Sequence, residues 1–176
     1  MMTVFDAADL YRAFNAAGIR IWIDGGWAVD ALLGRQTRPH QDLDIAIERN
    51  DVARLRELLA ARGYTDVPRD DTSAWNFVLG DDQGRDVDVH VVVFDPDGNG
   101  LYGPAEKGAM YPAASLTGMG TIDGQNVRCI SAASMVKFKT GYKLSAKDFA
   151  DVAALCEQFG IEYPDEHALR SSRTRP

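Results

Sequence analysis

The sequence predicts an α/β fold, because short strand-type runs alternate with helical segments along the chain. Residues 21–23 form an apolar run that ends at a glycine pair, and apolar residues then fall at helical spacing up to Gly34. Two later segments, residues 42–47 and 85–94, alternate apolar and polar side chains as half-buried strands do. At 176 residues the chain is long enough for one domain with its own core.

Composition and charge limit the partners that we expect. The formal net charge is −7, and the basic residues are scattered, so a nucleic acid is not expected as a partner and a small molecule, including a cationic one, fits better. No secretion leader and no run of 18 apolar residues is present, so we expect no membrane partner. Cys129 and Cys156 stand in apolar surroundings without metal-ligand spacing, and we expect a cytoplasmic protein with reduced thiols.

The first elements lead to an anion site. Residues 3–17 carry apolar side chains at helical spacing and end at Gly18, which predicts an amphipathic helix. Gly25 and Gly26 then follow the apolar strand and open the next helix. Free N–H groups and the helix dipole favour an anion such as phosphate at this position.

An acid pair follows on the next predicted strand. Alternation places Asp42 and Asp44 on the same face, where two carboxylates repel each other unless a cation neutralises them. Mg²⁺ is the cation usually held by carboxylates together with substrate phosphates. A solvated acid pair at a strand end is the ordinary alternative, and the glycine-led helix upstream is what favours a metal site.

A second acidic strand comes after a predicted helix over residues 52–62 and a strand over 74–79. Here Asp86, Asp88 and His90 share one face. Spacing alone leaves open which acid would complete a triad with Asp42 and Asp44. His90 is equally compatible with a histidine that is hydrogen-bonded at the edge of the core.

Residues 95–124 are rich in glycine, proline and turn pairs, and long loops of this kind often carry binding residues. Tyr102, Glu106 and Tyr111 could line an acceptor pocket there, or they could be ordinary surface residues. A hairpin is expected over residues 122–129.

A helix with several lysines follows the hairpin. Ser131 and Ser134 can open it, and Lys137, Lys139 and Lys143 punctuate its apolar pattern. These lysines could form a solvated face, or one of them could point at a bound anion.

The order of these motifs, GGWAVD, then RPHQDLDI, then VDVH, resembles the nucleotidyltransferase superfamily that includes DNA polymerase beta. Within it, the chain is most similar to small lincosamide nucleotidyltransferases and aminoglycoside 2''-adenylyltransferases, and the likeness runs from about Trp22 to Asp151. The resemblance implies a mixed, mostly antiparallel sheet flanked by helices, with C-terminal helices closing the cleft. It also implies a catalytic core at about residues 20–95 and a helical part at about 131–163. Chain length predicts one domain, over 1–165, and the loss of apolar periodicity past Leu169 predicts a flexible tail over 166–176.

The resemblance also implies a site. The family pattern of an acid between apolar residues before a histidine selects Asp88, so that Asp42, Asp44 and Asp88 would be catalytic and would hold Mg²⁺, two ions per site. The remaining expected contacts are nucleotide binding by Gly25, Gly26, Arg38 and Lys137, with Lys139 as the alternative lysine, and acceptor binding by His90, Tyr102 and Glu106.

The implied activity moves a nucleoside monophosphate, AMP from ATP, onto a hydroxyl of a lincosamide- or aminoglycoside-like antibiotic. Two alternatives stay open from sequence: an enzyme of toxin–antitoxin type that nucleotidylates a protein, and a catalytically silent nucleotide-binding module. The short chain further suggests that a homodimer completes the acceptor pocket.

Overall fold

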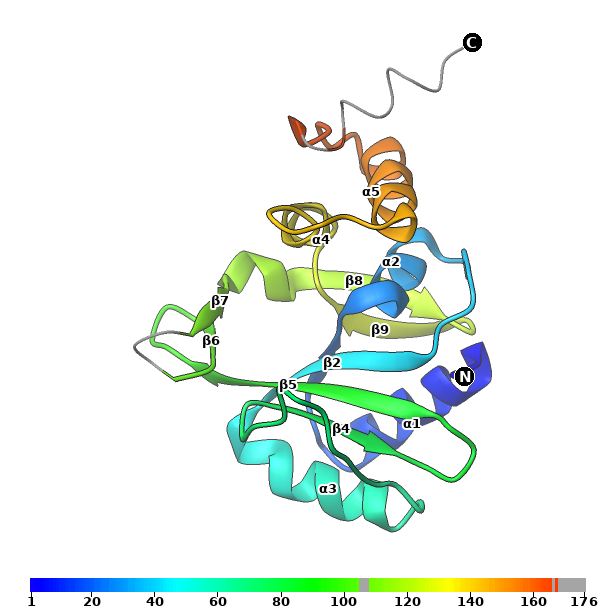
Figure 1. Cartoon of the computed structure of the whole chain (residues 1–176), viewed down its shortest axis with the longest axis vertical. Coiled ribbons are helices and arrows are strands. Elements are labelled where there is room, and N and C mark those ends of the chain that lie inside the picture. Colours follow the sequence, from blue (N-terminus) through cyan, green and yellow to red (C-terminus); the bar gives the residue numbers. More distant parts are fainter. Residues whose placement is uncertain (105–107, 166, 168–176) are drawn as a thin grey trace.

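Nine strands among the described residues, which are 1–104, 108–165 and 167, form one mixed sheet in this computed structural model (Figure 1). The strands are β1 (Ile21–Ile23), β2 (Asp42–Glu48), β3 (Thr65–Val67), β4 (Asn76–Gly80), β5 (Asp86–Phe94), β6 (Gly100–Tyr102), β7 (Ala109–Tyr111), β8 (Gly118–Ile122) and β9 (Gln125–Cys129). The helices are α1 (Val4–Ala16), α2 (Gly25–Leu33), α3 (Val52–Ala60), α4 (Ala132–Phe138) and α5 (Ala146–Phe159), with short 3-10 turns η1 (Arg49–Asp51) and η2 (Ala113–Thr117).

The main path of the sheet runs β3-β4-β5-β2-β1-β9-β8, and β6 and β7 extend from the end of β5. Only β1–β9 and β2–β5 pair in parallel among the described strands, and the other pairs are antiparallel. The predicted mixed, mostly antiparallel sheet flanked by helices is therefore confirmed.

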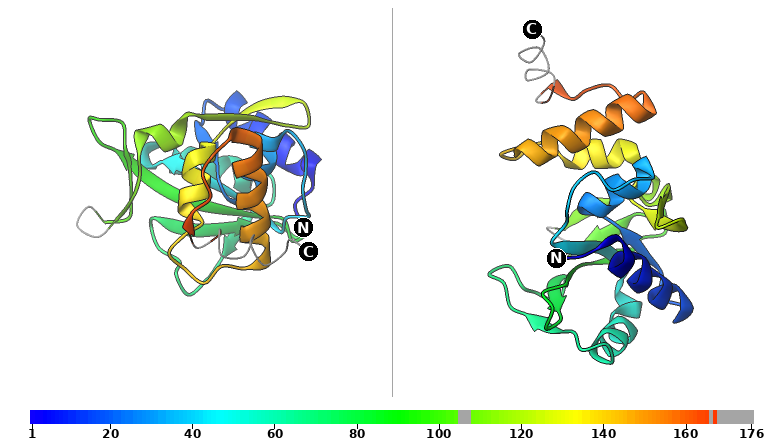
Figure 2. Two further views of the ribbon diagram at one scale, coloured as in Figure 1. Left: turned by 90° about the horizontal axis from the view of Figure 1, so that it is seen from above. Right: turned by 90° about the vertical axis from the view of Figure 1, so that its right-hand side faces the viewer.

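The helices gather at two ends of the sheet. In Figure 1, α4 and α5 stack above α2, whereas α1 and α3 lie lower. Figure 2 shows from above that α4 and α5 run side by side across the top of the molecule. The C-terminal helices thus cover α2, the helix that the glycine pair opens.

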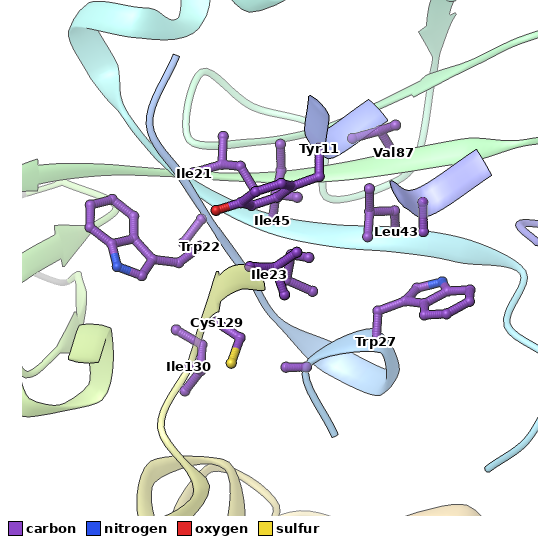
Figure 3. Close-up of a cluster of buried hydrophobic side chains, with 14 of the residues drawn as sticks. Tyr11, Ile21, Trp22, Ile23, Trp27, Leu43, Ile45, Val87, Cys129 and Ile130 are labelled. Carbon is purple, nitrogen blue, oxygen red and sulfur yellow. The ribbon is translucent and has the colours of Figure 1, made fainter. Parts of the chain in front are cut away.

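The core lies between the sheet and these helices (Figure 3). Alternation along β2 and β5 buries Leu43, Ile45, Val87 and Val89, all of them fully inaccessible to solvent. Trp27, on the buried side of α2, is 1% exposed. Burial of these apolar side chains is the main force that holds α2 against the sheet.

The predicted first helix and the predicted hairpin are both confirmed. Helix α1 starts at a capping box formed by Thr3 and Asp6, which was not predicted. The β8–β9 hairpin turns through Asp123 and Gly124, both at positive φ (50° and 72°), as a tight two-residue turn requires.

The segment predicted as a long loop, residues 95–124, is more ordered than expected. It contains β6, β7, η2 and β8, and their short lengths and abundant glycines hid them from pattern reading. Strand β3 was also missed, since a run of three residues gives no periodicity. Glu106 and the predicted tail, 166–176 apart from residue 167, lie outside the described residues. None of the helices in the described ranges is long and apolar enough to cross a membrane.

A glycine in β8 allows α2 to approach the sheet closely. A Cβ atom on Gly120 would collide with the Ala31 carbonyl group and lie 2.8 Å from the Leu32 nitrogen. We predict that Gly120→Ala lowers the free energy of unfolding by about 1–3 kcal/mol, as overpacking does, measured by urea denaturation. Met119→Ala, at a neighbouring side chain that is 60% exposed, is the control and should change it by less than about 0.5 kcal/mol.

Candidate functional site

The parallel pairing of β2 and β5 brings the predicted acids together. Asp42 pairs with Asp86 and Asp44 with Asp88, so each acid of one strand stands level with an acid of the other. Asp44, Asp88 and His90 each offer one ligand atom within 4.8 Å of the others, a cluster that could hold a metal ion. Asp86 is instead occupied, because its Oδ2 lies 3.0 Å from Nη2 of Arg69.

The electrostatics of this face indicate a missing positive charge. Burial raises the pKa of Asp44 to about 7, with further increases from the carboxylates of Asp42, Asp24 and Asp88. Burial also raises the pKa of Asp88, and Asp42 adds to the effect. The Oδ1 atom of Asp88 is buried without a hydrogen-bond partner within the described part of the chain. A divalent cation bound by carboxylates would satisfy all of these groups.

The first turn of α2 lies directly against the acidic strand. A side chain at Gly25, which has φ +58°, would collide with the Asp44 carboxylate. A side chain at Gly26 would collide with the His40 ring and come within 2.7 Å of Nη2 of Arg38. The absence of side chains at these two positions therefore leaves the helix N-terminus between a carboxylate on one side and a guanidinium on the other.

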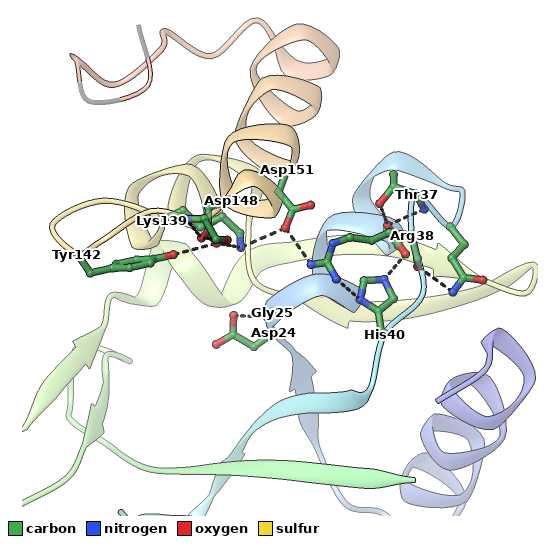
Figure 4. Close-up of polar contacts among 12 residues, drawn as sticks. Asp24, Gly25, Thr37, Arg38, His40, Lys139, Tyr142, Asp148 and Asp151 are labelled. Atoms are coloured by element: carbon green, nitrogen blue, oxygen red, sulfur yellow. Dashed lines mark hydrogen bonds and ion pairs between the residues drawn. The ribbon is translucent and has the colours of Figure 1, made fainter. Parts of the chain in front are cut away.

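Arg38 is held by partners on both sides (Figure 4). Its Nη1 donates to Nδ1 of His40 (2.9 Å), and its Nη2 donates to Oδ2 of Asp151 on α5 (3.1 Å). Since arginine has no acceptor, Nδ1 of His40 is unprotonated, and the protonated Nε2 donates to Oδ2 of the buried Asp30 (2.6 Å). Thr37 donates its backbone N–H and its hydroxyl to the other oxygen of Asp30.

Lys139 joins the same network. Its ammonium group lies 3.2 Å from Asp148 and 3.2 Å from Asp151, so Arg38 and Lys139 share one carboxylate. Lys137, the lysine that the sequence favoured, is exposed and forms no ion pair with any described residue. The structure thus brings Lys139, not Lys137, together with Arg38.

A second hydrogen-bonded chain runs from α2 to His90. The buried Asp24 caps α2 by accepting from the Gly25 N–H (2.7 Å), and it also accepts from the Tyr111 hydroxyl (2.8 Å). That hydroxyl lies 3.1 Å from Nδ1 of His90, whose ring packs on Tyr102 with centroids 5.4 Å apart. Burial raises the pKa of Tyr111, and the nearby Asp24 charge raises it further, so the phenol stays a proton donor.

Three residues of this arrangement were missed by sequence reasoning. Asp24 directly precedes the glycine pair at a position where aspartate is a favoured helix cap, and this signal could have found it. Asp151 lies in the Lys-Asp-x-x-Asp run at 147–151. This run was recognisable in the sequence, but it did not indicate a role for Asp151. Asp30 lies at helical spacing among apolar residues, and only the fold shows its buried partner His40.

Comparison with known proteins points to one family. A family model described as aminoglycoside-2''-adenylyltransferase matches residues 7–155. A lincosamide resistance protein of Staphylococcus haemolyticus is 26% identical over 142 residues, 81% of this chain and 87% of that protein. A 2''-aminoglycoside nucleotidyltransferase of Escherichia coli is 40% identical over 56 residues, 30% of this chain and 32% of that protein.

Solved structures agree with this match. The crystal structure of the lincosamide antibiotic adenylyltransferase LnuA, lincomycin-bound, superposes with a TM-score of 0.72 at 25% identity and covers 86% of this chain and 93% of that one. ANT(2'')-Ia in complex with adenylyl-2''-tobramycin has the same fold, with a TM-score of 0.71 at 22% identity over 98% of both chains. The predicted resemblance is confirmed, and neither the protein-modifying nor the catalytically silent alternative is favoured.

The raised pKa of Asp44 predicts a pH dependence of stability. Between the ordinary value of 3.8 and about 7, the folded state retains a proton that the unfolded state has lost. Without divalent cations, the free energy of unfolding should therefore fall as pH rises from 5 to 8, measured by urea denaturation in EDTA. Asp44→Asn should flatten this slope. Asp86→Asn should leave it unchanged, and an unaltered slope in Asp44→Asn would contradict the assignment.

Proposed function

The chain belongs to the aminoglycoside-2''-adenylyltransferase family, and on that premise we propose that it transfers AMP from ATP to a hydroxyl group of an aminoglycoside- or lincosamide-like antibiotic. One observation carries this proposal. The side-chain-free first turn of α2 separates the Asp44 carboxylate from the Arg38 guanidinium, which is the arrangement that a metal-bound triphosphate requires. Nucleotide transfer is the activity that is named for the family, for the Escherichia coli relative and for the lincomycin-bound structure.

The carboxylates of Asp42, Asp44 and Asp88 would hold the divalent cation, which we propose to be Mg²⁺, two ions per site. Oδ1 of Asp88, which is buried and has no hydrogen-bond partner among the described residues, and the raised pKa of Asp44 support this fit. When bound, the cation supplies neutralisation of the phosphate charge and polarisation of the α-phosphate. The three carboxylates would fix the position of the bound cation beside the α2 N-terminus.

The nucleotide would lie over the first turn of α2. The N–H groups of Gly26 and Trp27, which have no partner among the described residues, would bind phosphate oxygens, and Arg38 would add a positive charge beside them. The second positively charged side chain beside the phosphates would be Lys139 rather than the expected Lys137, because Lys139 is ion-paired with Asp148 and Asp151. His40 and Asp151 hold Arg38 in place from opposite sides.

In this scheme the acceptor oxygen attacks the α-phosphorus, an O–P bond forms, and the bond to the leaving pyrophosphate breaks in line with it. The acceptor O–H bond breaks at the same time, and a carboxylate oxygen of Asp88 accepts the proton. His90 and Tyr102, which lie beside Asp88 on the same side of the sheet, would contact the acceptor. The homodimer and the cytoplasmic location stay predictions from the sequence.

The direct test is a transfer assay. The protein is incubated with Mg²⁺, each of the four NTPs and a panel that includes lincomycin and tobramycin, and pyrophosphate release and product mass are measured. A product heavier than the antibiotic by one AMP unit is the expected result. Pyrophosphate release that requires no acceptor, or no product with any member of the panel, would contradict the proposal.

The two acids of β5 offer a matched pair of variants. Asp88→Asn should lower kcat by about 10²–10⁴-fold or more, because it removes both a base and a metal ligand. The affinity for ATP should fall less. Asp86→Asn, which loses only the ion pair with Arg69, should stay within about tenfold of wild type. The reverse order of effects would show that the wrong acid was chosen.

Lys137 in α4 and Lys139 directly after the helix offer a second matched pair of variants. Lys139→Met should raise KM for ATP by about tenfold or more, because a charge beside the triphosphate is lost. Lys137→Met should leave KM within about twofold. Circular dichroism checks the fold, since Asp148 and Asp151 lose a partner in the first variant, and Lys139→Arg should recover ATP binding.

A further inference from the structure

The two cations beside the first turn of α2 are already neutralised by acids of α5. Nη2 of Arg38 lies 3.1 Å from Oδ2 of Asp151. The Lys139 ammonium group lies 3.2 Å from the same oxygen and 3.2 Å from Oδ1 of Asp148. At contact distance the carboxylates cancel most of the attraction that both cations would exert on a phosphate group. A triphosphate therefore gains the full charge of either cation only if that cation leaves its carboxylate.

Lys139 is the cation that can leave. Arg38 is held on two sides, because His40 accepts from its Nη1 and Asp151 accepts from its Nη2. The Lys139 ammonium group contacts only the two acids of α5 among the described residues. A lysine carries its charge at the end of a flexible four-carbon stem, whereas an arginine with two hydrogen bonds is fixed in direction.

The backbone of Lys139 stays in place while its side chain turns. Its N–H donates to the Met135 carbonyl group in α4 (3.3 Å). Its own carbonyl group accepts from Nε2 of His167 (2.7 Å), whose ring packs on Phe149 of α5 with centroids 4.9 Å apart. Rotation about the side-chain bonds of Lys139 is therefore the only movement that its departure requires.

A phosphate group over the α2 turn lies within reach of that rotation. Nη2 of Arg38 lies over the turn, because a Cβ atom on Gly26 would come within 2.7 Å of it. A single oxygen of Asp151 contacts both this Nη2 and the Lys139 ammonium group, and Figure 4 shows Asp151 pointing from α5 to the two cations. The ammonium group is thus one carboxylate oxygen away from the guanidinium that would meet the phosphates.

The two acids keep hydrogen-bond donors when Lys139 moves. Oδ2 of Asp148 accepts from the Ser145 N–H (2.8 Å) and hydroxyl (2.5 Å), and its Oδ1 accepts from the Tyr142 hydroxyl (3.1 Å). Asp151 retains Arg38. A buried carboxylate is costly when it has no partner, and the departure of the lysine leaves both acids with one.

We propose that Asp148 and Asp151 hold Lys139 in a resting position when no nucleotide is bound. The triphosphate then draws the ammonium group away from both acids, while Arg38 stays on Asp151. The inference rests on the proposed function for the presence of a nucleotide over α2. It adds a switch, because Lys139 is available only to a ligand whose phosphates compete with two carboxylates. A ligand without phosphate leaves Lys139 at rest.

The test is a double-mutant cycle on nucleotide binding. A non-hydrolysable ATP analogue is titrated with Mg²⁺ by calorimetry into the wild-type protein, Asp148→Asn, Lys139→Met and the double variant. Asp148→Asn should raise the affinity of the wild-type protein about three- to tenfold, because one of the two charges that compete for Lys139 is lost. In the Lys139→Met background the same substitution should change the affinity by less than about twofold.

Asp148→Asn keeps the cap of α5, because an asparagine amide oxygen still accepts from the Ser145 N–H. Glu157→Gln removes an exposed acid of the same helix, and as the matched control it should bind the analogue as wild type does. A lower or unchanged affinity in Asp148→Asn overturns the resting position, since Asp148 would then align Lys139 or leave it unaffected. An equal rise in both backgrounds also overturns it, since the effect would be one of overall charge.

A second measurement uses the wild-type protein and does not depend on how the variants fold. The ammonium signal of Lys139 is followed by NMR in protein that carries isotope-labelled lysine, and it is assigned by its absence from Lys139→Arg. The signal should shift when the ATP analogue is added and stay unchanged with adenosine, which has no phosphate. No shift with bound analogue overturns the inference alone, and no binding of the analogue to wild type overturns it together with the proposed function. If Lys139 responds as expected but no AMP is transferred, the resting position stands and the proposed function fails.

Discussion

The close approach of the first turn of α2 to strand β2 is the constraint on which the rest of the site depends. A Cβ atom at Gly25 would collide with the Asp44 carboxylate and one at Gly26 with His40 and Arg38, so a single methyl group at either position would force the turn away from the strand. The Gly25 N–H is taken up by Asp24, and the N–H of Gly26 has no partner among the described residues and lies in this turn, beside a carboxylate and a guanidinium at once. It is stable because Trp27 and the apolar face of β2 are buried beneath it.

The charges around this turn connect distant parts of the chain. Asp30, His40, Arg38, Asp151 and Lys139 follow one another without a break from α2 to the C-terminal helices. Each buried carboxylate in the series has a cation or a hydrogen-bond donor, so no charge is left uncompensated there. The acidic face of β2 and β5 is different, because its carboxylates repel one another and Asp88 has an orphan oxygen. A cluster of carboxylates that repel one another, beside a network whose carboxylates are paired, has the features expected of a binding site.

The parts of this site that lie on one strand could be read from the sequence, and the parts that depend on tertiary approach could not. A period of two placed Asp42 with Asp44 and Asp88 with His90, and the glycine pair predicted the helix N-terminus. Arg38 and Asp151 stand 113 positions apart, so no local pattern reports their ion pair. The resemblance assigned Lys137 to the nucleotide with Lys139 as the alternative, and no local pattern reports that Lys139, directly after the end of α4, pairs with Asp148 and Asp151. Short strands such as β6 and β7 give too few residues for a period.

If the α2 turn and the acidic face form one site, the nucleotide and the divalent cation must bind cooperatively. Calorimetric titration of a non-hydrolysable ATP analogue, in EDTA and then at several Mg²⁺ concentrations, measures this coupling directly. We expect the affinity for the analogue to rise with Mg²⁺ beyond the increase that Mg²⁺–ATP complex formation explains, and the protein to bind Mg²⁺ more tightly by the same factor when the analogue is present. An affinity for the analogue that is the same in EDTA and in Mg²⁺ would contradict the account.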